Sequence, residues 1–236
     1  MLAVGTTQAQ SPQMSQGLAV KRNLDGDVSQ RLFCISSVRS VSAKEIIFCQ
    51  GDAADHVYEV VEGVVKLYIL TADGRLQITG FAYPGQILAL DADTAYSTTA
   101  EAITPTKLCQ YPRTKFERVI DDHPELARQL FAIVAKDLMA ARGQMLLLGR
   151  KSATEKIASF LVYLAEKNEE RGQDPAIIDL PMPRGDIGDY LGLTIETVSR
   201  TITRLRQLSV LDLRQHRQVR IRDRDRLDEL AEGDEV

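Results

Sequence analysis

Four glycines recur at nearly equal spacing in the first half of the chain, at positions 51, 63, 74 and 85. Each comes after a short run rich in Val, Ile, Tyr or Phe. Asp73-Gly74 separates two such runs, and this dipeptide strongly favours a β-hairpin turn. Short strands that alternate with turns every 11 or 12 residues are typical of an antiparallel sandwich or jelly roll. We therefore expect a β-roll over residues 28–120.

The hydrophobic period becomes helical after Thr114. Six apolar residues follow in steps of 4, 4, 3, 4 and 3: Leu130, Val134, Leu138, Ala141, Met145 and Leu148. Their mean spacing of about 3.5 is that of a coiled-coil seam, and Pro124 suits the first turn of a helix. We expect a dimerisation helix at residues 121–150, with the six residues facing a second copy of the chain. The alternative is a helix that packs this stripe against its own β domain.

The chain ends are predicted to differ in order. Residues 1–27 are rich in Gln, Ser, Thr and Gly, and we expect a disordered tail. Residues 151–236 are typical of a small domain with a helix at 151–170, a strand at 177–180, helices at 184–191 and 195–208, and a β-wing at 210–221. The run Arg222-Asp-Arg-Asp-Arg226 is expected to be solvated surface.

The segment from Arg184 to Thr203 fits a helix-turn-helix. Gly188 lets the two helices approach, Gly192 supplies a left-handed turn, and Thr194 can cap the second helix. The expected fold class is therefore α+β: an N-terminal β-roll (jelly roll), a long dimerisation helix and a C-terminal winged helix-turn-helix.

The outward side of the second helix has the residue types that read DNA. Glu196, Ser199 and Arg200 would face a major groove, where Arg can bond guanine and Glu can accept from cytosine. Seven arginines and one acid lie between Arg200 and Arg222, although the net charge of the chain is −4. Such a local basic face suits phosphate contacts. The candidates for backbone contact are Arg184, Thr194, Thr197, Thr203, Arg204 and Arg217. The alternative is an ordinary helical hairpin with a solvated Glu–Arg pair.

These features resemble the CRP/FNR family of bacterial transcription regulators over about residues 30–225. The resemblance is carried by Leu76-Gln-Ile-Thr-Gly-Phe81, Met145-Leu-Leu-Leu148 and the segment Arg184–Arg200. Glu196, Ser199 and Arg200 match the FNR-type recognition triad, which implies a two-fold site of the TTGAT-N4-ATCAA kind. The FixK type is the most similar subgroup, and it implies an activator of microaerobic or nitrogen-fixation-related genes.

The resemblance also implies RNA polymerase as a partner. The hairpin at Asp73, Gly74 and Arg75 is the candidate contact.

Effector binding is predicted to be absent. Cyclic-nucleotide members of the family hold the phosphate with a Glu in Gly-Glu-Leu and an Arg in Arg-Ser-Ala. The matching stretches here are Gly85–Leu90 and Ser97–Ala100, which have neither residue, and a buried phosphate without a cation is costly. Oxygen-sensing members use four cysteines for an iron–sulfur cluster, whereas this chain has three distant ones, Cys34, Cys49 and Cys109. We expect no cofactor and no metal.

Two alternatives stay open. One is a haem- or ligand-dependent sensor of the same architecture, with His56 and His123 as haem candidates. The other is an enzyme or cyclic-nucleotide-controlled β-roll protein, although the chain has no nucleotide-binding loop, nucleophile elbow or paired-carboxylate motif. Apolar runs such as Met145–Leu148 are too short to span a bilayer, and the first residues make a poor signal peptide. The expected location is therefore the cytoplasm, with no membrane contact.

Overall fold

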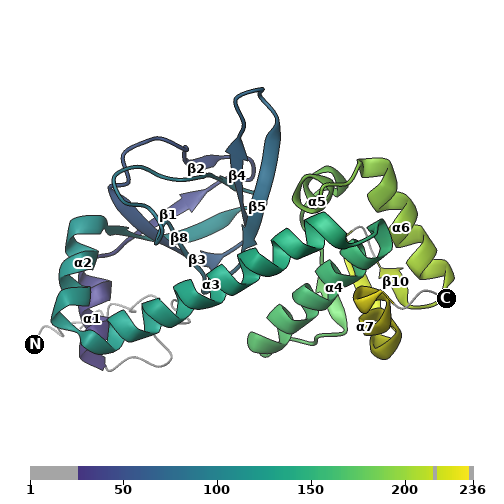
Figure 1. The fold of residues 1–236 in the computed structure, drawn as a ribbon. Coiled ribbons are helices and arrows are strands. Elements are labelled where there is room, and N and C mark those ends of the chain that lie inside the picture. The colour runs from purple at the N-terminus through teal and green to yellow at the C-terminus, as the bar shows by residue number, and fades with distance from the viewer. Residues whose placement is uncertain (1–25, 215–216, 234–236) are drawn as a thin grey trace, which may run out of the picture.

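The structure, a computed structural model of the chain, describes residues 26–214 and 217–233. A β-roll lies along one long helix, and a mostly helical C-terminal domain surrounds the C-terminal end of that helix (Figure 1). The expected fold class, a β-roll, a long helix and a winged helix-turn-helix, is confirmed.

The β-roll is built from two four-stranded sheets in the orders β1-β8-β3-β6 and β2-β7-β4-β5, with antiparallel neighbours throughout. Its strands are β1 (Ser37–Val41), β2 (Ile46–Phe48), β3 (His56–Glu62), β4 (Val65–Leu70), β5 (Leu76–Ala82), β6 (Ile87–Leu88), β7 (Thr99–Ala102) and β8 (Thr106–Pro112). The turn glycines are required by the backbone, most clearly at Gly63, where φ is +93° and a Cβ would lie 2.6 Å from the Pro105 carbonyl oxygen.

Three helices flank the roll: α1 (Gly26–Ile35), α2 (Arg113–Asp122) and α3 (Pro124–Arg150). Helix α1 was not predicted, and it begins within the last two residues of the expected tail. Residues 1–25 of that tail lie outside the described part of the chain. Val28 and Leu32 of α1 are buried in a cluster with Tyr111 and Phe116, so tertiary packing stabilises a helix that is too short to be stable alone.

The C-terminal domain contains α4 (Ala153–Glu170), β9 (Ile177–Asp179), α5 (Arg184–Leu191), α6 (Ile195–Gln207), β10 (Leu211–Arg214), β11 (Gln218–Ile221) and α7 (Arg224–Glu232). Its three strands form one sheet in the order β10-β11-β9. Residues 215–216, in the expected wing, lie outside the described residues.

Residues 222–226 are exposed or half-buried, as predicted for a solvated surface, but residues 223–226 also cap and begin helix α7, which was not predicted. Asp223 caps α7 by accepting a hydrogen bond from the Arg226 N–H at 2.9 Å. Leu227 and Leu230 are buried in the core of the C-terminal domain. The sequence did not predict α7 because the helix begins with alternating charges and its apolar residues come later.

The two domains share one apolar cluster. Val64, Tyr68, Ile78, Phe81 and Tyr83 of the β-roll belong to the same buried cluster as the core of the C-terminal domain. The helix-turn-helix is therefore connected to the rest of the molecule by more than the chain that follows the long helix. Its orientation depends on packing against the roll.

Candidate nucleic-acid interface

The turn between α5 and α6 has the local geometry that its sequence predicts. Gly192 has φ 63° and ψ 43°, and its N–H is donated to the Gly188 carbonyl. A Cβ at Gly188 would lie 2.5 Å from the Leu193 carbonyl oxygen, so this close approach excludes any side chain. Thr194 accepts a hydrogen bond from the Thr197 N–H at 3.2 Å and caps α6. The roles predicted for both glycines and for Thr194 are confirmed.

A small apolar core fixes α6 against α5. Ile187, Leu191 and Val198 belong to one buried cluster and are each at most 1% exposed. Contacts that fix the orientation of α5 therefore also fix the orientation of α6.

The residues predicted to contact bases lie on the solvent side of α6. Glu196, Ser199 and Arg200 are exposed, whereas Ile202 and Leu205 face the core. The pKa of Glu196 is lowered, first by a hydrogen bond from its own N–H, then by the Thr194 hydroxyl and the nearby Arg200 charge. The carboxylate is therefore ionised at neutral pH and can act as an acceptor.

Arg200 and Glu196 lie one turn apart on α6, but no ion pair joins them in the described structure. Arg200 Nη2 donates instead to Thr197 Oγ1 at 3.4 Å, a long and exposed contact that DNA could replace. Thr203 uses its hydroxyl to bond the Ser199 carbonyl at 2.9 Å.

The predicted phosphate contacts fall into two groups. Arg204 and Arg217 are exposed, and Arg217 Nη1 also donates to the Pro181 carbonyl at 2.9 Å. Arg184 begins α5 and is half-buried, and its Nη1 has no hydrogen-bond partner among the described residues. Arg222, part of the predicted basic run, pairs with Asp212 at 2.5 Å and so adds little net charge there.

The predicted seam on α3 is mostly exposed. Val134, Leu138, Ala141, Met145 and Leu148 face solvent, Met145 with 72% of its surface. Leu130 differs, since it is 6% exposed and packs in the core of the β-roll side. The prediction that Leu130 faces a second copy of the chain is therefore wrong, because α3 still crosses the roll at this turn.

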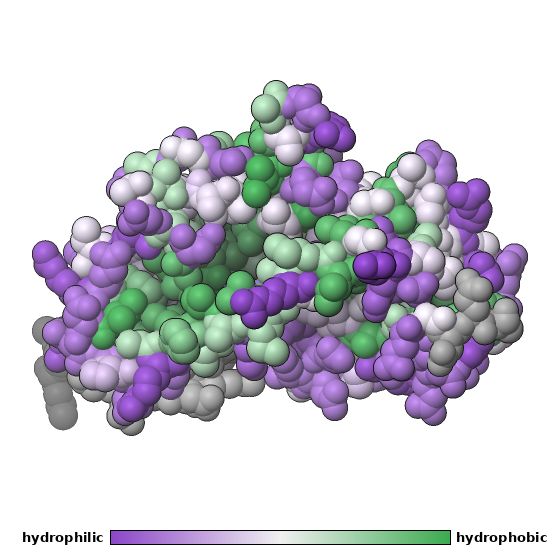
Figure 2. Space-filling view, viewed as in Figure 1, coloured by the Kyte–Doolittle hydropathy of each residue, from purple (hydrophilic) through white to green (hydrophobic). Residues whose placement is uncertain are grey.

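Three further apolar residues of α3 that the seam spacing did not include are also exposed: Phe131, Met139 and Leu146. Phe131 is 76% exposed. Figure 2 shows apolar side chains gathered in a hollow along the long helix and the adjoining side of the roll. An exposed apolar surface of this kind, on a protein in water, indicates an interaction site.

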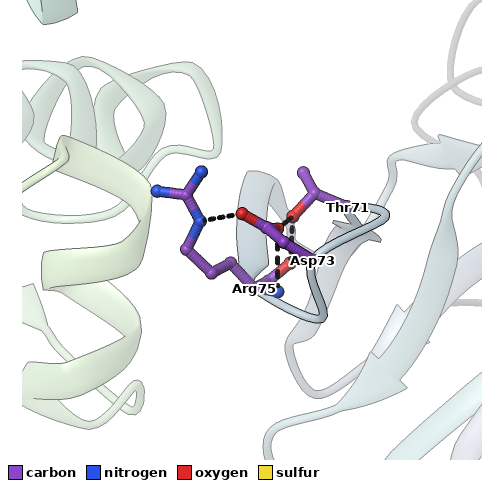
Figure 3. A network of polar contacts seen from close by, with 3 residues as sticks. All are labelled: Thr71, Asp73 and Arg75. Carbon is purple, nitrogen blue, oxygen red and sulfur yellow. Dashed lines mark hydrogen bonds and ion pairs between the residues drawn. The ribbon is translucent and has the colours of Figure 1, made fainter.

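The hairpin between β4 and β5 presents an ordered polar tip. Asp73 accepts hydrogen bonds from Thr71 Oγ1 at 2.5 Å and from Arg75 Nε at 2.7 Å, as Figure 3 shows. Gly74 completes the turn with φ +79°. These hydrogen bonds lower the pKa of Asp73, so the tip keeps a charged carboxylate at neutral pH.

The interior of the β-roll is filled by its own side chains. Phe48, Tyr58 and Tyr96 are buried, and the Phe48 ring stacks on Tyr96 with 4.1 Å between ring centroids. At the position of the phosphate-binding Glu, Gln86 Oε1 accepts the Tyr83 N–H at 2.8 Å. The roll thus uses this polar group to close its own turn.

Ser97 begins the stretch Ser97–Ala100, which the resemblance matches to the phosphate-binding segment with the Arg. Its hydroxyl donates to Asp91 at 2.5 Å, so the position is occupied by a neutral group beside an acid. An anionic ligand would meet repulsion here instead of a cation.

In the described parts of the chain, no three His, Cys, Asp or Glu side chains are grouped so that they could hold a metal ion. Cys34 is exposed and Cys109 is buried. His123 Nδ1 lies 2.8 Å from the Val119 carbonyl oxygen, and His56 begins β3.

A cavity of about 450 Å³ lies outside the roll interior, where the Tyr83–Ile87 turn meets α3 and α4. Its lining includes Lys167, which pairs with Glu170 at 2.7 Å, and Arg171, whose guanidinium lies 4.7 Å from the Tyr83 ring centroid. The volume suits a small organic molecule.

Comparisons with known proteins place both domains. Residues 38–123 match the family described as cyclic nucleotide-binding domain, and residues 155–230 match the Crp-like helix-turn-helix domain. The nitrogen fixation regulation protein FixK of Bradyrhizobium diazoefficiens is 43% identical over 164 residues, which are 70% of this chain and 69% of the relative. The chain belongs to the CRP/FNR family.

Two more relatives sharpen the assignment of this CRP/FNR protein. The transcriptional activatory protein AadR of Rhodopseudomonas palustris is 41% identical over 188 residues, covering 80% of this chain and 78% of the relative. The structure of FixK2 from Bradyrhizobium japonicum has a TM-score of 0.78 at 38% identity and covers 83% of this chain and 97% of that one. The predicted resemblance to the family, with the FixK type as most similar subgroup, is confirmed.

The CRP/FNR protein is a transcription activator with a helix-turn-helix DNA-binding domain, not an enzyme, as its relatives show. Within the described residues, no helix is both long and apolar enough to cross a membrane.

Proposed function

We propose that the chain acts in the cytoplasm as a homodimer that activates transcription from a two-fold site of the TTGAT-N4-ATCAA kind, without a small-molecule effector. The observation that carries the proposal is the exposed triad of Glu196, Ser199 and Arg200 on one side of a capped and packed helix α6. The names of the FixK relatives support target genes related to nitrogen fixation, and the subgroup adds microaerobic genes.

In this proposal each residue of the triad reads a base edge. Arg200 donates to guanine O6 and N7, and Glu196 accepts from cytosine N4. The residues Arg184, Thr194, Thr197, Thr203, Arg204 and Arg217 contact the backbone. For Thr194 and Thr197 the contact is best made through the two hydroxyls, which lie 3.1 Å apart at the start of α6, because the Thr197 N–H already donates to Thr194 Oγ1 at 3.2 Å.

The homodimer would form through α3. Its five exposed seam residues carry no charge, so two copies can meet without desolvating an ion. The apolar residues Phe131, Met139 and Leu146 of α3 are also exposed. A dimer places two α6 helices on one two-fold site, which is how helix-turn-helix proteins bind palindromes.

Effector independence is supported by the β-roll. Its interior is packed by Phe48, Tyr58 and Tyr96, and Gln86 and Ser97 bond within the roll itself. The deciding experiment is DNA binding by purified, colourless, cofactor-free protein. We expect a gel shift of the palindrome without additives, whereas binding that requires cyclic AMP, haem or iron and sulfide would refute effector independence.

A second candidate is a ligand-dependent regulator of the same architecture, and the cavity at the Tyr83–Ile87 turn favours it. Absorbance and native mass spectrometry of protein purified from its host distinguish the two. A bound chromophore or added mass that is needed for the gel shift supports the ligand-dependent candidate.

The ordered hairpin tip at Asp73, Gly74 and Arg75 is the proposed contact for RNA polymerase. We expect Arg75→Ala to leave DNA affinity unchanged and to lower transcription in a purified system. An equal fall in both would place the residue in DNA binding instead.

A further inference from the structure

Helix α5 is held from three directions by side chains of other elements. Gln77 Nε2 of β5 donates to the Asp189 carbonyl at 2.6 Å. Gln144 Nε2 of α3 donates to the Tyr190 carbonyl at 2.9 Å. Lys66 of β4 forms an ion pair with Asp186 of α5. Each of these contacts joins the helix-turn-helix to a part of the molecule outside the C-terminal domain.

The ion pair at Lys66 is a shielded triad. Its Nζ lies 3.5 Å from Asp186 Oδ2 and 3.3 Å from Glu101 Oε1. The side chains of Lys66 and Asp186 are only 13% and 17% exposed, so solvent screens their attraction less than that of a surface pair. Glu101 fixes the lysine from within the roll.

An aromatic cluster supports the same contact. The ring of Tyr190 on α5 lies 5.3 Å from Phe81 of β5 and 5.6 Å from Phe160 of α4, centroid to centroid. The rings give the contact area, and the three polar contacts fix where along the roll α5 lies.

These contacts connect the dimer helix to the recognition helix. α3 carries the apolar seam, Gln144 of α3 contacts α5, and the core of Ile187, Leu191 and Val198 fixes α6 to α5. The direction of α6 relative to a two-fold axis along α3 is therefore set by side-chain contacts as well as by the chain linkage at Lys151.

We propose that Lys66, Gln77 and Gln144 are positioning residues that determine which half-site spacing the dimer accepts. This inference rests on the proposed homodimer and its two-fold DNA site. Adding one base pair between half-sites moves one of them by about 3.4 Å along the duplex and rotates it by about 35° around it. A helix-turn-helix held from three directions cannot follow such a shift, whereas a released one can.

The test measures spacing preference and base preference separately. Full-length protein is titrated by fluorescence anisotropy against duplexes with identical half-sites and three, four, five or six intervening base pairs. The variants are Gln77→Ala, Gln144→Ala and Lys66→Gln. Gln77 is exposed, so its truncation leaves folding intact, which thermal melting checks.

The wild type should prefer one spacing strongly. Each variant should reduce the ratio between the best and the next spacing by about fivefold, because one contact per subunit is lost. The double variant with both Gln77→Ala and Gln144→Ala loses two contacts per subunit, and its ratio should fall further. Preference for bases within a half-site should not change. Lys107→Ala is the matched control, because its ion pair with Glu62 at 2.6 Å lies within the roll and does not involve α5.

Three outcomes would overturn the proposal. A variant that changes affinity for all spacings by one factor, up or down, shows that the contacts stabilise the fold or the dimer without setting geometry. A wild type that binds all spacings equally shows that nothing fixes the spacing. A folded, dimeric wild type that binds no palindrome refutes the proposed function itself, and the positioning role fails with it.

Discussion

The inner surface of the β-roll and the outer surface of α6 treat their polar groups in opposite ways. In the roll, Gln86 and Ser97 lie in the two stretches that match the phosphate-binding segments of cyclic-nucleotide members, and each bonds to a neighbour within the roll. On α6, Glu196 and Arg200 are exposed on a rigid helix and bond only locally. A buried polar group with a partner stabilises a fold, whereas an exposed one on a rigid element is available to a ligand.

This contrast indicates where regulation can act. A roll whose interior is occupied has little differential affinity for an effector, and an effector can shift an equilibrium only by such a difference. Transcription activation would then depend on how much protein is present and on how its two subunits are joined.

Leu138→Asp should have the largest effect. Leu138 is 52% exposed on α3, and two such aspartates would face each other near the proposed two-fold axis, at a cost of at least a few kcal/mol if both stay ionised. We expect monomers by light scattering and loss of palindrome binding. Ala140→Asp, an exposed residue on the opposite side of α3, is the control and should remain dimeric. A dimeric Leu138→Asp variant would show that copies associate elsewhere.

Tyr96→Ala should destabilise the roll without changing what α6 reads. The buried ring stacks on Phe48, so its removal should lower the free energy of unfolding by about 3–5 kcal/mol. Tyr96→Phe keeps the ring and removes only the hydroxyl that contacts His56, which should cost about 1 kcal/mol. Chemical denaturation gives both values. Folded Tyr96→Ala that has acquired dependence on an added ligand would contradict a purely structural interior.

The sequence predicts the helix-turn-helix well because its signals are local. A left-handed glycine at position 192 and a capping Thr194 fix the ends of α5 and α6 within four residues of chain. The turns of the roll are predictable for the same reason, since Gly63 and Gly74 are required by backbone geometry.

The missing parts depend on contacts between distant residues. Helices α1 and α7 are short and become stable only when Leu32 or Leu227 is buried by the rest of the fold. Leu130 has the same spacing as the other seam residues, and only the crossing of α3 over the roll decides that it is buried. The pairing of Lys66 with Asp186 joins residues that no periodicity relates.

Arg200→Ala tests the exposed side of the contrast. Loss of a two-pronged contact to guanine should cost about 1–3 kcal/mol per half-site and flatten preference at one base pair. In a dimer the total could reach roughly twice that if the half-sites are additive. Glu196→Ala should instead relax preference at a cytosine and can raise non-specific affinity, since the carboxylate repels phosphate.

The measurement for both variants is a titration against the palindrome, its single-base variants and random duplex. An Arg200→Ala protein that loses affinity equally for every duplex would mean that another side of α6 faces the groove.

Arg217→Ala should have the smallest effect and a different signature. Arg217 is exposed in the wing, and one of its nitrogens donates to the Pro181 carbonyl at 2.9 Å, which leaves the rest of the guanidinium facing solvent. If it contacts a phosphate, its loss should weaken all duplexes about equally and reduce the salt slope by roughly one per lost contact. If it serves only to hold the wing to Pro181, the melting temperature should fall while the salt slope stays constant. Titration at several salt concentrations separates these outcomes, with Lys107→Ala in the distant roll as the control for a lost surface charge. A change confined to one base pair would instead make Arg217 a base-reading residue and extend the specific surface from α6 into the wing.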